Sequence, residues 1–300
     1  SEESHYSFLK AAHQLGIGTK QIVKVSCDLN GHMDPIELEK AIQVSIDEGK
    51  QPIFVGATAG TTVRGTFDPL SKIADICDKF NLWFHVDASW GGSVIISSKH
   101  NHLLNGVDRS NSLTWCAHKM MGMPLMCTAA LFKDSSILQK INSVHGTDYL
   151  FHDDIDNNIN LGEHSLQCGR RTDAVKLWLS WKYLGDKGFE KNIDHIFDMA
   201  QYARNKIEAS KLLKLITPVE SLNICFQIQP EAIQPSDWNN FNIQVREEIL
   251  ENGKIMVNYA SIKDTTCFRL ITSNFKLNQK DLDFFFSELE ETVFSLLATK

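Results

Sequence analysis

The sequence lacks several patterns that would indicate common classes of protein. Its seven cysteines are scattered and include no Cys-x-x-Cys pair, which argues against a zinc site or redox motif and favours a reducing compartment. No apolar run is as long as a membrane span, and the first residues have neither the basic start nor the apolar segment of a signal peptide. We therefore expect a cytoplasmic protein.

A strong charge of either sign is also absent. The 30 basic and 37 acidic residues give a formal net charge of -7 without a long run of one sign, so nucleic acid and anionic membranes are not expected as partners. Residues 15–19 (LGIGT) lack the spacing of a dinucleotide fingerprint, and no Gly-x-x-x-x-Gly-Lys-Ser/Thr loop occurs. A small-molecule or protein partner is the better expectation.

The sequence does contain short apolar runs that alternate with helical patterns. The runs are rich in Val, Ile and Phe and lie at 21–26, 52–58, 82–88, 112–117 and 126–132. This alternation predicts an α/β fold with a mostly parallel sheet covered by helices. Asp34-Pro35 and Asp68-Pro69 are signals for helix starts, and each predicted helix would be the crossover of a βαβ unit.

From about residue 173 the pattern changes to long amphipathic helices. Strand candidates follow at 221–229 and 265–273, and a closing helix begins near Asn278. We expect a large domain over residues 1–180 and a smaller C-terminal α/β domain over residues 181–300.

Residues 142–165 fit neither the strand nor the helix pattern. They are polar and rich in turn residues, yet they carry the aromatic cluster Tyr149-Leu150-Phe151. A stretch of this length is typical either of a lid that closes over a site or of an exposed loop.

Lys119 is the first candidate for chemistry. It lies in TWCAHKMMGMPLMC, residues 114–127, among a tryptophan and four methionines. An ammonium at the edge of an apolar pocket loses hydration, which favours the neutral amine, a nucleophile toward a carbonyl. Such a lysine suits Schiff-base chemistry. The alternative is a lysine whose stem is buried and whose head reaches water, while the methionines pack the core.

Asp87 is the second candidate, because it ends the apolar run at 82–88. Open parallel sheets bind their ligands at the carboxyl ends of their strands. A carboxylate there can keep the ring nitrogen of pyridoxal phosphate protonated, so that the ring accepts electrons from a breaking bond at the substrate's Cα. Asp87 and Lys119 would supply the two groups that this cofactor needs most. The alternatives for Asp87 are a helix N-cap or, with His85, a metal ligand, although no further ligand cluster has convincing spacing.

A family resemblance rests on seven motifs in order along the chain. They are SEESHYS (1–7), ATAGTT (57–62), HVDASWGG (85–92), HKMMG (118–122), DYLF (148–151), QCGRR (167–171) and FRLITSN (268–274). Together they resemble the pyridoxal-phosphate-dependent group II amino-acid decarboxylases, most closely the glutamate, aspartate and cysteine-sulfinate branch. The resemblance implies an aspartate-aminotransferase-like fold, a homodimer and pyridoxal 5'-phosphate as cofactor.

The resemblance also implies roles at the cofactor. Lys119 would bind it covalently, and Asp87 would pair with its pyridine nitrogen. His5 would stack on the cofactor ring, Thr62 would lie beside it, and His118 would help to set the site.

Two further residues would act on the substrate. Tyr149, on a lid that closes over the partner subunit's site, would deliver a proton to Cα after carbon dioxide leaves. Arg269 would hold a substrate carboxylate, a role that suits its planar guanidinium. The implied reaction converts glutamate, aspartate or cysteine sulfinate to the corresponding amine and carbon dioxide.

Two features depart from the family pattern. Cys116 stands where members usually have Asn or Asp, which alters a polar contact near the cofactor phosphate. Members are also longer at the N-terminus, so we expect this chain to be a piece that lacks a phosphate-binding segment and part of the dimer surface. Two alternatives stay open. One is a catalytically silent or truncated paralogue that acts as a dimerisation partner, and the other is an aminotransferase or aromatic amino-acid decarboxylase on the same scaffold.

Overall fold

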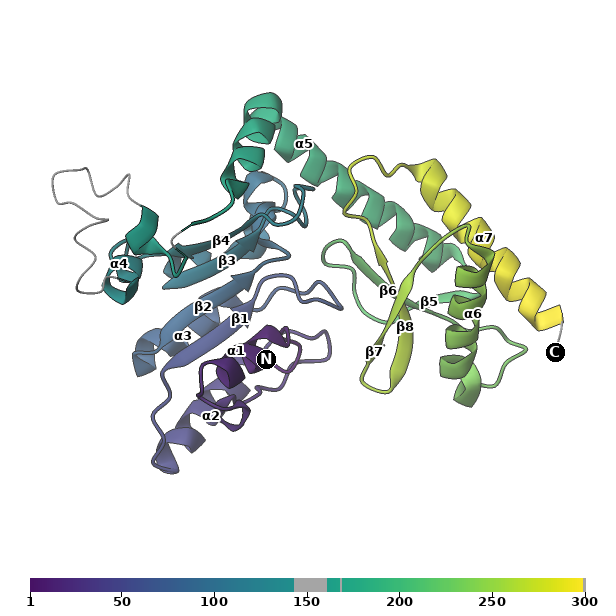
Figure 1. Ribbon diagram of the computed structural model, residues 1–300. Coiled ribbons are helices and arrows are strands. Elements are labelled where there is room, and N and C mark those ends of the chain that lie inside the picture. The colour runs from purple at the N-terminus through teal and green to yellow at the C-terminus, as the bar shows by residue number, and fades with distance from the viewer. Residues whose placement is uncertain (143–160, 168, 299–300) are drawn as a thin grey trace.

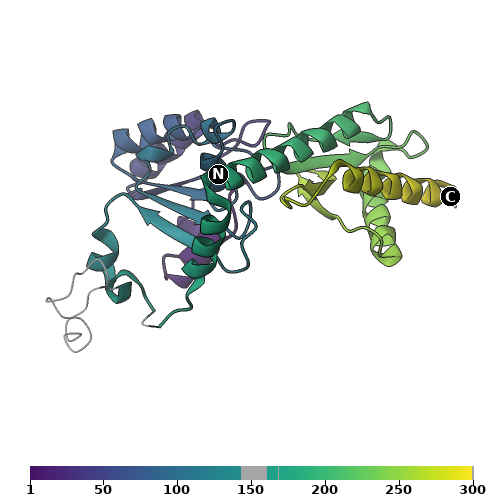
Figure 2. The ribbon, with the colours of Figure 1, turned by 90° about the horizontal axis from the view of Figure 1, so that it is seen from above.

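The computed structural model describes residues 1–142, 161–167 and 169–298. Figure 1 shows two lobes, each built on a four-stranded sheet. The long helix α5 (Asp173–Ala209) runs from the first lobe to the second, as the view from above in Figure 2 makes clear.

The first sheet has the strand order β1-β2-β3-β4 and is mostly parallel. β1 pairs in parallel with β2, and β2 with β3, whereas β4 is antiparallel to β3. Helix α3 (Leu70–Phe80) is the crossover from β1 to β2. The strands are β1 (Phe54–Thr58), β2 (Trp83–Ala88), β3 (Ser112–Cys116) and β4 (Thr128–Phe132). The predicted α/β fold class is confirmed.

The two faces of β2 have different neighbours because successive side chains of a strand alternate between faces. Phe84 and Val86 are buried in the core with Ile73 of α3. His85, on the opposite face, makes an edge contact with the ring of Phe8, 6.1 Å between centroids. Phe8 belongs to the short helix α1 (Ser7–Gln14), so helices cover both faces of the first sheet.

One predicted strand, 21–26, is wrong. A 3-10 turn, η1 (Thr19–Gln21), ends at its first residue, and within the described residues no ladder pairs the segment with a strand. Instead, the Glu2 N–H donates to the Val25 carbonyl. An apolar run becomes a strand only where a partner is available, and in this chain β1 forms the edge of the sheet.

The two Asp-Pro signals behave differently. Asp34 caps α2 (Pro35–Asp47) by accepting from the Ile36 N–H at 2.8 Å, as predicted. Asp68 does not cap α3. Its carboxylate is buried and accepts from the Met33 and Thr58 N–H groups, both at 2.7 Å. Burial raises the pKa of Asp68, and those two hydrogen bonds oppose the rise.

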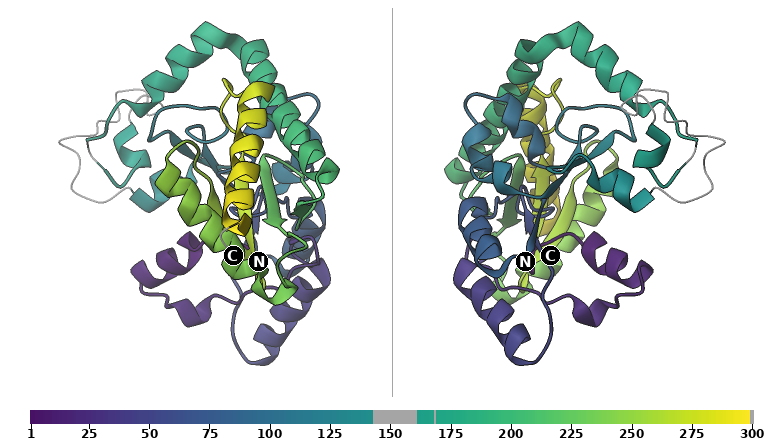
Figure 3. Two further views of the ribbon diagram at one scale, coloured as in Figure 1. Left: turned by 90° about the vertical axis from the view of Figure 1, so that its right-hand side faces the viewer. Right: turned by 90° about the vertical axis from the view of Figure 1, so that its left-hand side faces the viewer.

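The second sheet has the order β5-β6-β8-β7 and is antiparallel throughout. Its strands are β5 (Leu213–Leu215), β6 (Asn223–Ile228), β7 (Asn258–Ile262) and β8 (Thr265–Ile271). β6, β8 and the closing helix α7 (Gln279–Ala298) were predicted, whereas β5, β7 and α6 (Trp238–Asn252) were not. Figure 3 shows α7, in yellow, beside the far part of α5.

Alternate residues of β6 again face two different environments. Ile224, Phe226 and Ile228 form one core with residues of α5, α6 and α7. Asn223 and Cys225 point the other way, toward the loop that follows β1. The three helices therefore cover one face of the second sheet, and the other face meets the first lobe.

The predicted domain boundary at residues 180/181 lies within α5. Trp181 and Leu184 pack with the first lobe, while Met199 and Ala203 lie in the core of the second. Between them the backbone of Gly185 leaves the helical region (φ 64°, ψ 179°) and kinks α5. The division into two domains stays a prediction. No helix in the described part of the chain is long and apolar enough to cross a membrane.

Candidate functional site

A cavity of about 500 Å³ lies at the carboxyl ends of β1, β2 and β3. Parallel strands end at the same edge of a sheet, so residues from separate parts of the sequence meet there. A volume of this size suits a small cofactor with part of a substrate. Five of the seven predicted site residues line it: His5, Thr62, Asp87, His118 and Lys119.

Lys119 lies in the tight turn that follows β3. Its N–H donates to the Cys116 carbonyl at 3.2 Å, and its own carbonyl accepts from the Gly122 N–H at 3.1 Å. Met120 and Met121 are fully buried and Met123 nearly so, so three of the four methionines pack the core, whereas Met126 is exposed. The buried neighbours hold the turn in place, and the Lys119 side chain lines the cavity.

Asp87 lies near the end of β2, in register with Thr58 of β1 and Thr114 of β3. Its Oδ1 accepts a hydrogen bond of 3.1 Å from the Ser89 N–H, which orients the carboxylate at the cavity wall. The described residues contain no group of three or more His, Cys, Asp or Glu side chains that could hold a metal ion.

His85 also lines the cavity, and the sequence reasoning gave it no role at the cofactor. Its Nδ1 lies 2.8 Å from the Ser112 Oγ, and its ring stacks on Phe54 at 5.7 Å. Burial lowers the pKa of His85, against the opposing effect of the Asp87 charge. A neutral His85 leaves the Asp87 carboxylate free to pair with a cation in the cavity. The signal in the sequence was its position two residues before Asp87, on the same face of the strand.

The other predicted cofactor residues come from turns at the rim. His5 precedes α1, and its Nδ1 accepts from the Ser7 N–H at 3.3 Å. His118 Nδ1 lies 3.0 Å from both the N and the O of Cys127, so either tautomer ties the ring to the chain before β4. Cys116, where the family pattern has Asn or Asp, lies with its Sγ 3.3 Å from the Thr128 Oγ1.

Two predicted residues are not in this group. Arg269 lies on β8 in register with Cys225 and does not line the cavity. Its Nε is buried and has no hydrogen-bond partner in the described part of the chain, and burial lowers the pKa of the guanidinium. Tyr149 and the centre of the predicted lid lie outside the described residues.

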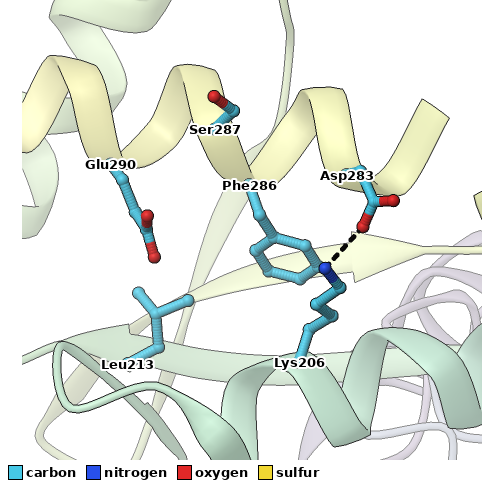
Figure 4. Close-up of a pocket in the computed structure, with 6 residues that line it drawn as sticks. All are labelled: Lys206, Leu213, Asp283, Phe286, Ser287 and Glu290. Carbon is cyan, nitrogen blue, oxygen red and sulfur yellow. Dashed lines mark ion pairs between the residues drawn. The ribbon is translucent and has the colours of Figure 1, made fainter. Parts of the chain in front are cut away.

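A second hollow, of about 240 Å³, lies between α5, β5 and α7 (Figure 4). An ion pair of 2.6 Å between Lys206 and Asp283 crosses it, and the Tyr202 hydroxyl donates to the same carboxylate at 2.8 Å. Two of its three charged groups, Lys206 and Asp283, are already paired with each other, so it offers no comparable set of groups for a cofactor.

The first cavity provides the chemistry that pyridoxal phosphate needs. Lys119 would offer an amine to the cofactor's carbonyl, and Asp87 would offer a carboxylate to its ring nitrogen. His5, Phe8 and Trp90 supply flat walls for an aromatic ring. Fold and site together define an α/β protein built around a pyridoxal-type cofactor.

Comparisons with known proteins agree with this class. Residues 1–229 match the family model described as Pyridoxal-dependent decarboxylase conserved domain. The chain therefore belongs to the pyridoxal-dependent decarboxylase family. Family membership confirms the predicted cofactor, pyridoxal phosphate.

Three solved structures of known proteins resemble this chain. Mouse CSAD, a cysteine sulfinic acid decarboxylase, is 38% identical with a TM-score of 0.90, over 97% of this chain and 62% of its own. The glutamate decarboxylase domain of a diaminobutyrate-pyruvate transaminase and L-2,4-diaminobutyrate decarboxylase from Vibrio parahaemolyticus is 25% identical. Its TM-score is 0.82, over 100% of this chain and 58% of its own. Oryza sativa TDC, solved with PLP and tryptamine, is 24% identical with a TM-score of 0.92, over 99% of this chain and 62% of its own, and shares the fold.

These matches confirm the resemblance to group II decarboxylases near the cysteine-sulfinate branch. They also show that the chain spans 62% of the length of mouse CSAD.

Proposed function

We propose that the protein to which this chain belongs is a carboxy-lyase that removes the α-carboxylate of an acidic amino acid. The proposed substrate is glutamate, aspartate or cysteine sulfinate, and the products are the corresponding amine and carbon dioxide. The observation that carries the proposal is the placement of Lys119 and Asp87 around one cavity at the carboxyl edge of a parallel sheet.

In this proposal the residues around the cavity have different roles. Pyridoxal phosphate, when bound, supplies an electron sink for the charge left at Cα as carbon dioxide departs. Lys119 would hold the cofactor at its carbonyl carbon. Asp87 would keep a proton on the ring nitrogen, and the lowered pKa of His85 means that this imidazole would not compete for the Asp87 carboxylate. His5 covers the ring, while Thr62 and His118 line the rim.

Arg269 is the proposed contact for a substrate carboxylate. A buried guanidinium Nε without a partner in the described residues is costly unless a ligand or water satisfies it. Identity to mouse CSAD, at 38%, also favours an acidic substrate. In this proposal Tyr149 donates the proton to Cα after decarboxylation, from a lid that acts across a dimer.

A homodimer is the proposed assembly, and cytoplasmic the proposed location. The first half of α5 has an exposed apolar stripe at helical spacing: Val175, Trp178, Leu179 and Tyr183. The opposite side of the same helix packs in the core through Leu177, Trp181 and Leu184. An exposed stripe of this kind is typical of an interface between proteins.

Lys119→Ala tests the proposal most directly. The wild-type chain with added pyridoxal phosphate should show a new visible absorbance band, and borohydride followed by mass spectrometry should place the cofactor's mass on Lys119. Lys119→Ala should lose that band and all release of carbon dioxide from acidic amino acids, because no other amine lines the cavity in the described residues. Lys72→Ala, which changes an exposed lysine on α3, is the matched control and should keep both.

The outcomes separate the alternatives. Carbon dioxide release from tryptophan or tyrosine instead of acidic substrates would indicate an aromatic amino-acid decarboxylase. Cofactor bound without turnover, in a longer form of the protein as well, would indicate a silent paralogue. Turnover by Lys119→Ala would contradict the mechanism.

A further inference from the structure

One face of β6 is hydrogen-bonded to the loop that carries Thr62. This loop, residues 60–67, follows β1 and is called the Thr62 loop here. Asn223 Nδ2 donates to the Thr62 carbonyl at 3.0 Å and to the Val63 carbonyl at 2.9 Å. The Ser221 hydroxyl donates to the Gly65 carbonyl at 2.9 Å. Side chains of the second lobe therefore bind three carbonyls of a loop in the first, those of Thr62, Val63 and Gly65.

Two neighbouring side chains extend the contact. The Cys225 thiol donates to the Val63 carbonyl at 3.3 Å, and the Glu220 carboxylate accepts from the Phe67 N–H at 3.3 Å. Asn223 and Cys225 alternate along β6, so they share one face, and Ser221 lies just before the strand. Asn223 and Ser221 are almost fully buried, which makes these bonds inaccessible to competing water.

The Thr62 loop cannot satisfy these carbonyls by itself. Its own backbone bonds run from the Gly60 and Thr61 N–H groups to the Thr66 carbonyl, and from the Gly65 N–H to the Thr61 carbonyl. They close the loop at its base and leave the carbonyls of Thr62, Val63 and Gly65 directed at β6. Buried carbonyls need partners, and β6 supplies them.

Gly65 allows the close approach. Its φ is +74°, a conformation that L side chains rarely adopt, and a Cβ at this position would lie 2.3 Å from the Ser221 Oγ. Any larger residue would push the loop away from β6 or strain the turn.

We infer that Asn223 is a positioning residue for the cofactor cavity, because its side-chain amide fixes the backbone of Thr62. Cys225, on the same face, is in register with Arg269 of β8. The second sheet thus carries Arg269 and sets the Thr62 rim of the cavity at the same time. The position of the second lobe determines the shape of the site although Asn223 does not line it. Only the expected effect on cofactor binding rests on the proposed function; the contact between Asn223 and the Thr62 loop does not.

Hydrogen exchange without cofactor tests the contact itself. Asn223→Leu keeps the approximate size of the side chain and removes both donors. Exchange in residues 59–68 should accelerate about tenfold or more, while β2 stays unchanged, because two buried hydrogen bonds are lost. Ser221→Ala, which removes one bond, is the milder variant and should accelerate the same residues about threefold.

Asn242→Leu is the matched control. Asn242 is as buried as Asn223, but among the described residues its amide bonds only to Ile228 and Trp238, both in the second lobe. This variant should loosen residues 223–252 and leave residues 59–68 unchanged. If Asn223→Leu leaves residues 59–68 unchanged, or if Asn242→Leu accelerates them equally, the inference is wrong.

A titration with pyridoxal phosphate then tests the link to the cavity. Asn223→Leu should weaken its binding about tenfold, with Asn242→Leu close to wild type. Faster exchange with unchanged affinity would overturn the positioning role. If the wild-type protein itself fails to bind the cofactor, the proposed function fails, while the exchange result still decides whether Asn223 holds the loop.

Discussion

The two sheets differ in strand direction and in what each brings to the cavity. In the first, parallel strands end together, so Thr58, Asp87 and Cys116 line one cavity although they are distant in sequence. In the second, antiparallel strands alternate their ends, and no strand end of this sheet reaches the cavity lining. That sheet acts through one face, where Ser221, Asn223 and Cys225 hold a loop of the first lobe.

Strand direction explains why the first sheet carries the residues that line the cavity and the second sheet holds a loop in position. In a parallel sheet the carboxyl ends of the strands lie at the same edge. Reactive side chains from several strands therefore meet there, and a ligand can bind among them. An antiparallel sheet presents a flat face, which suits contact with another part of the chain. Changes in the first sheet should therefore affect the reaction, and changes in the second should affect stability or the shape of the site.

The largest effect is expected at Asp87. Asp87→Asn keeps the shape of the side chain but removes the charge that would hold the ring nitrogen protonated, so kcat should fall about a thousandfold. Steady-state kinetics and the thermal midpoint, measured together, would separate chemistry from folding. Asp75→Asn, which changes an exposed carboxylate on α3, is the control and should leave kcat unchanged. A normal kcat in Asp87→Asn would contradict the expectation that changes in the first sheet affect the reaction.

The core of the second sheet comes next. Phe226 is fully buried, with ring centroids 5.5 Å from Phe268 and 6.3 Å from Phe286. Phe226→Ala should lower the free energy of unfolding by about 3–5 kcal/mol, measured by urea denaturation. If the lobes are separate domains, Phe226→Ala should accelerate hydrogen exchange much more in β5–β8 than in β1–β4.

Phe284→Ala is the control for that experiment. Phe284 is an exposed ring on the neighbouring helix α7, so its removal should change the free energy of unfolding by about 0.5 kcal/mol or less. Equal acceleration of exchange in both sheets of Phe226→Ala would argue for a single cooperative unit.

A smaller effect is expected at the seam between the lobes. His32 Nε2 lies 2.6 Å from Glu220 Oε1, and Nδ1 lies 2.9 Å from Asp28 Oδ2. The hydrogen bond to Glu220, with further support from Asp28, raises the pKa of His32 to about 9. Because the folded value exceeds the unfolded one, the stabilisation is complete below about pH 6.5 and is lost as the pH rises through about 9.

The free energy of unfolding should therefore fall by about 1–2 kcal/mol between pH 7 and pH 9.5, since the pair is partly solvated. His32→Gln should remove that part of the pH dependence. Urea denaturation of both proteins at the two pH values would measure the change in the free energy of unfolding. An identical change in wild type and variant would exclude His32 as the cause.

The smallest effect is expected at the second hollow. Lys206→Met removes the exposed ion pair with Asp283 but keeps the aliphatic stem. Exposed pairs contribute little because water and salt screen them, so thermal midpoint and kcat should both match wild type. A loss of activity would give this hollow a function that its geometry does not suggest.

Particular residues show how far the sequence could predict this structure. The strand at 82–88 and the helix after Asp34 were predictable because each depends on local pattern, alternation in one case and a side-chain cap in the other. The strand at 21–26 was mispredicted because pairing depends on a neighbour that sequence pattern does not reveal. Asp68 was mispredicted because its partners, Met33 and Thr58, are distant along the chain.

The sequence by itself determined the family, the cofactor and the candidates Lys119 and Asp87, because these depend on residue types in short motifs. Only the tertiary structure decided that burial lowers the pKa of His85 at the cavity wall, that Arg269 lies outside the lining, and that Asn223 holds the Thr62 loop. Those facts depend on burial and on contacts between residues up to 161 positions apart, which no local pattern encodes.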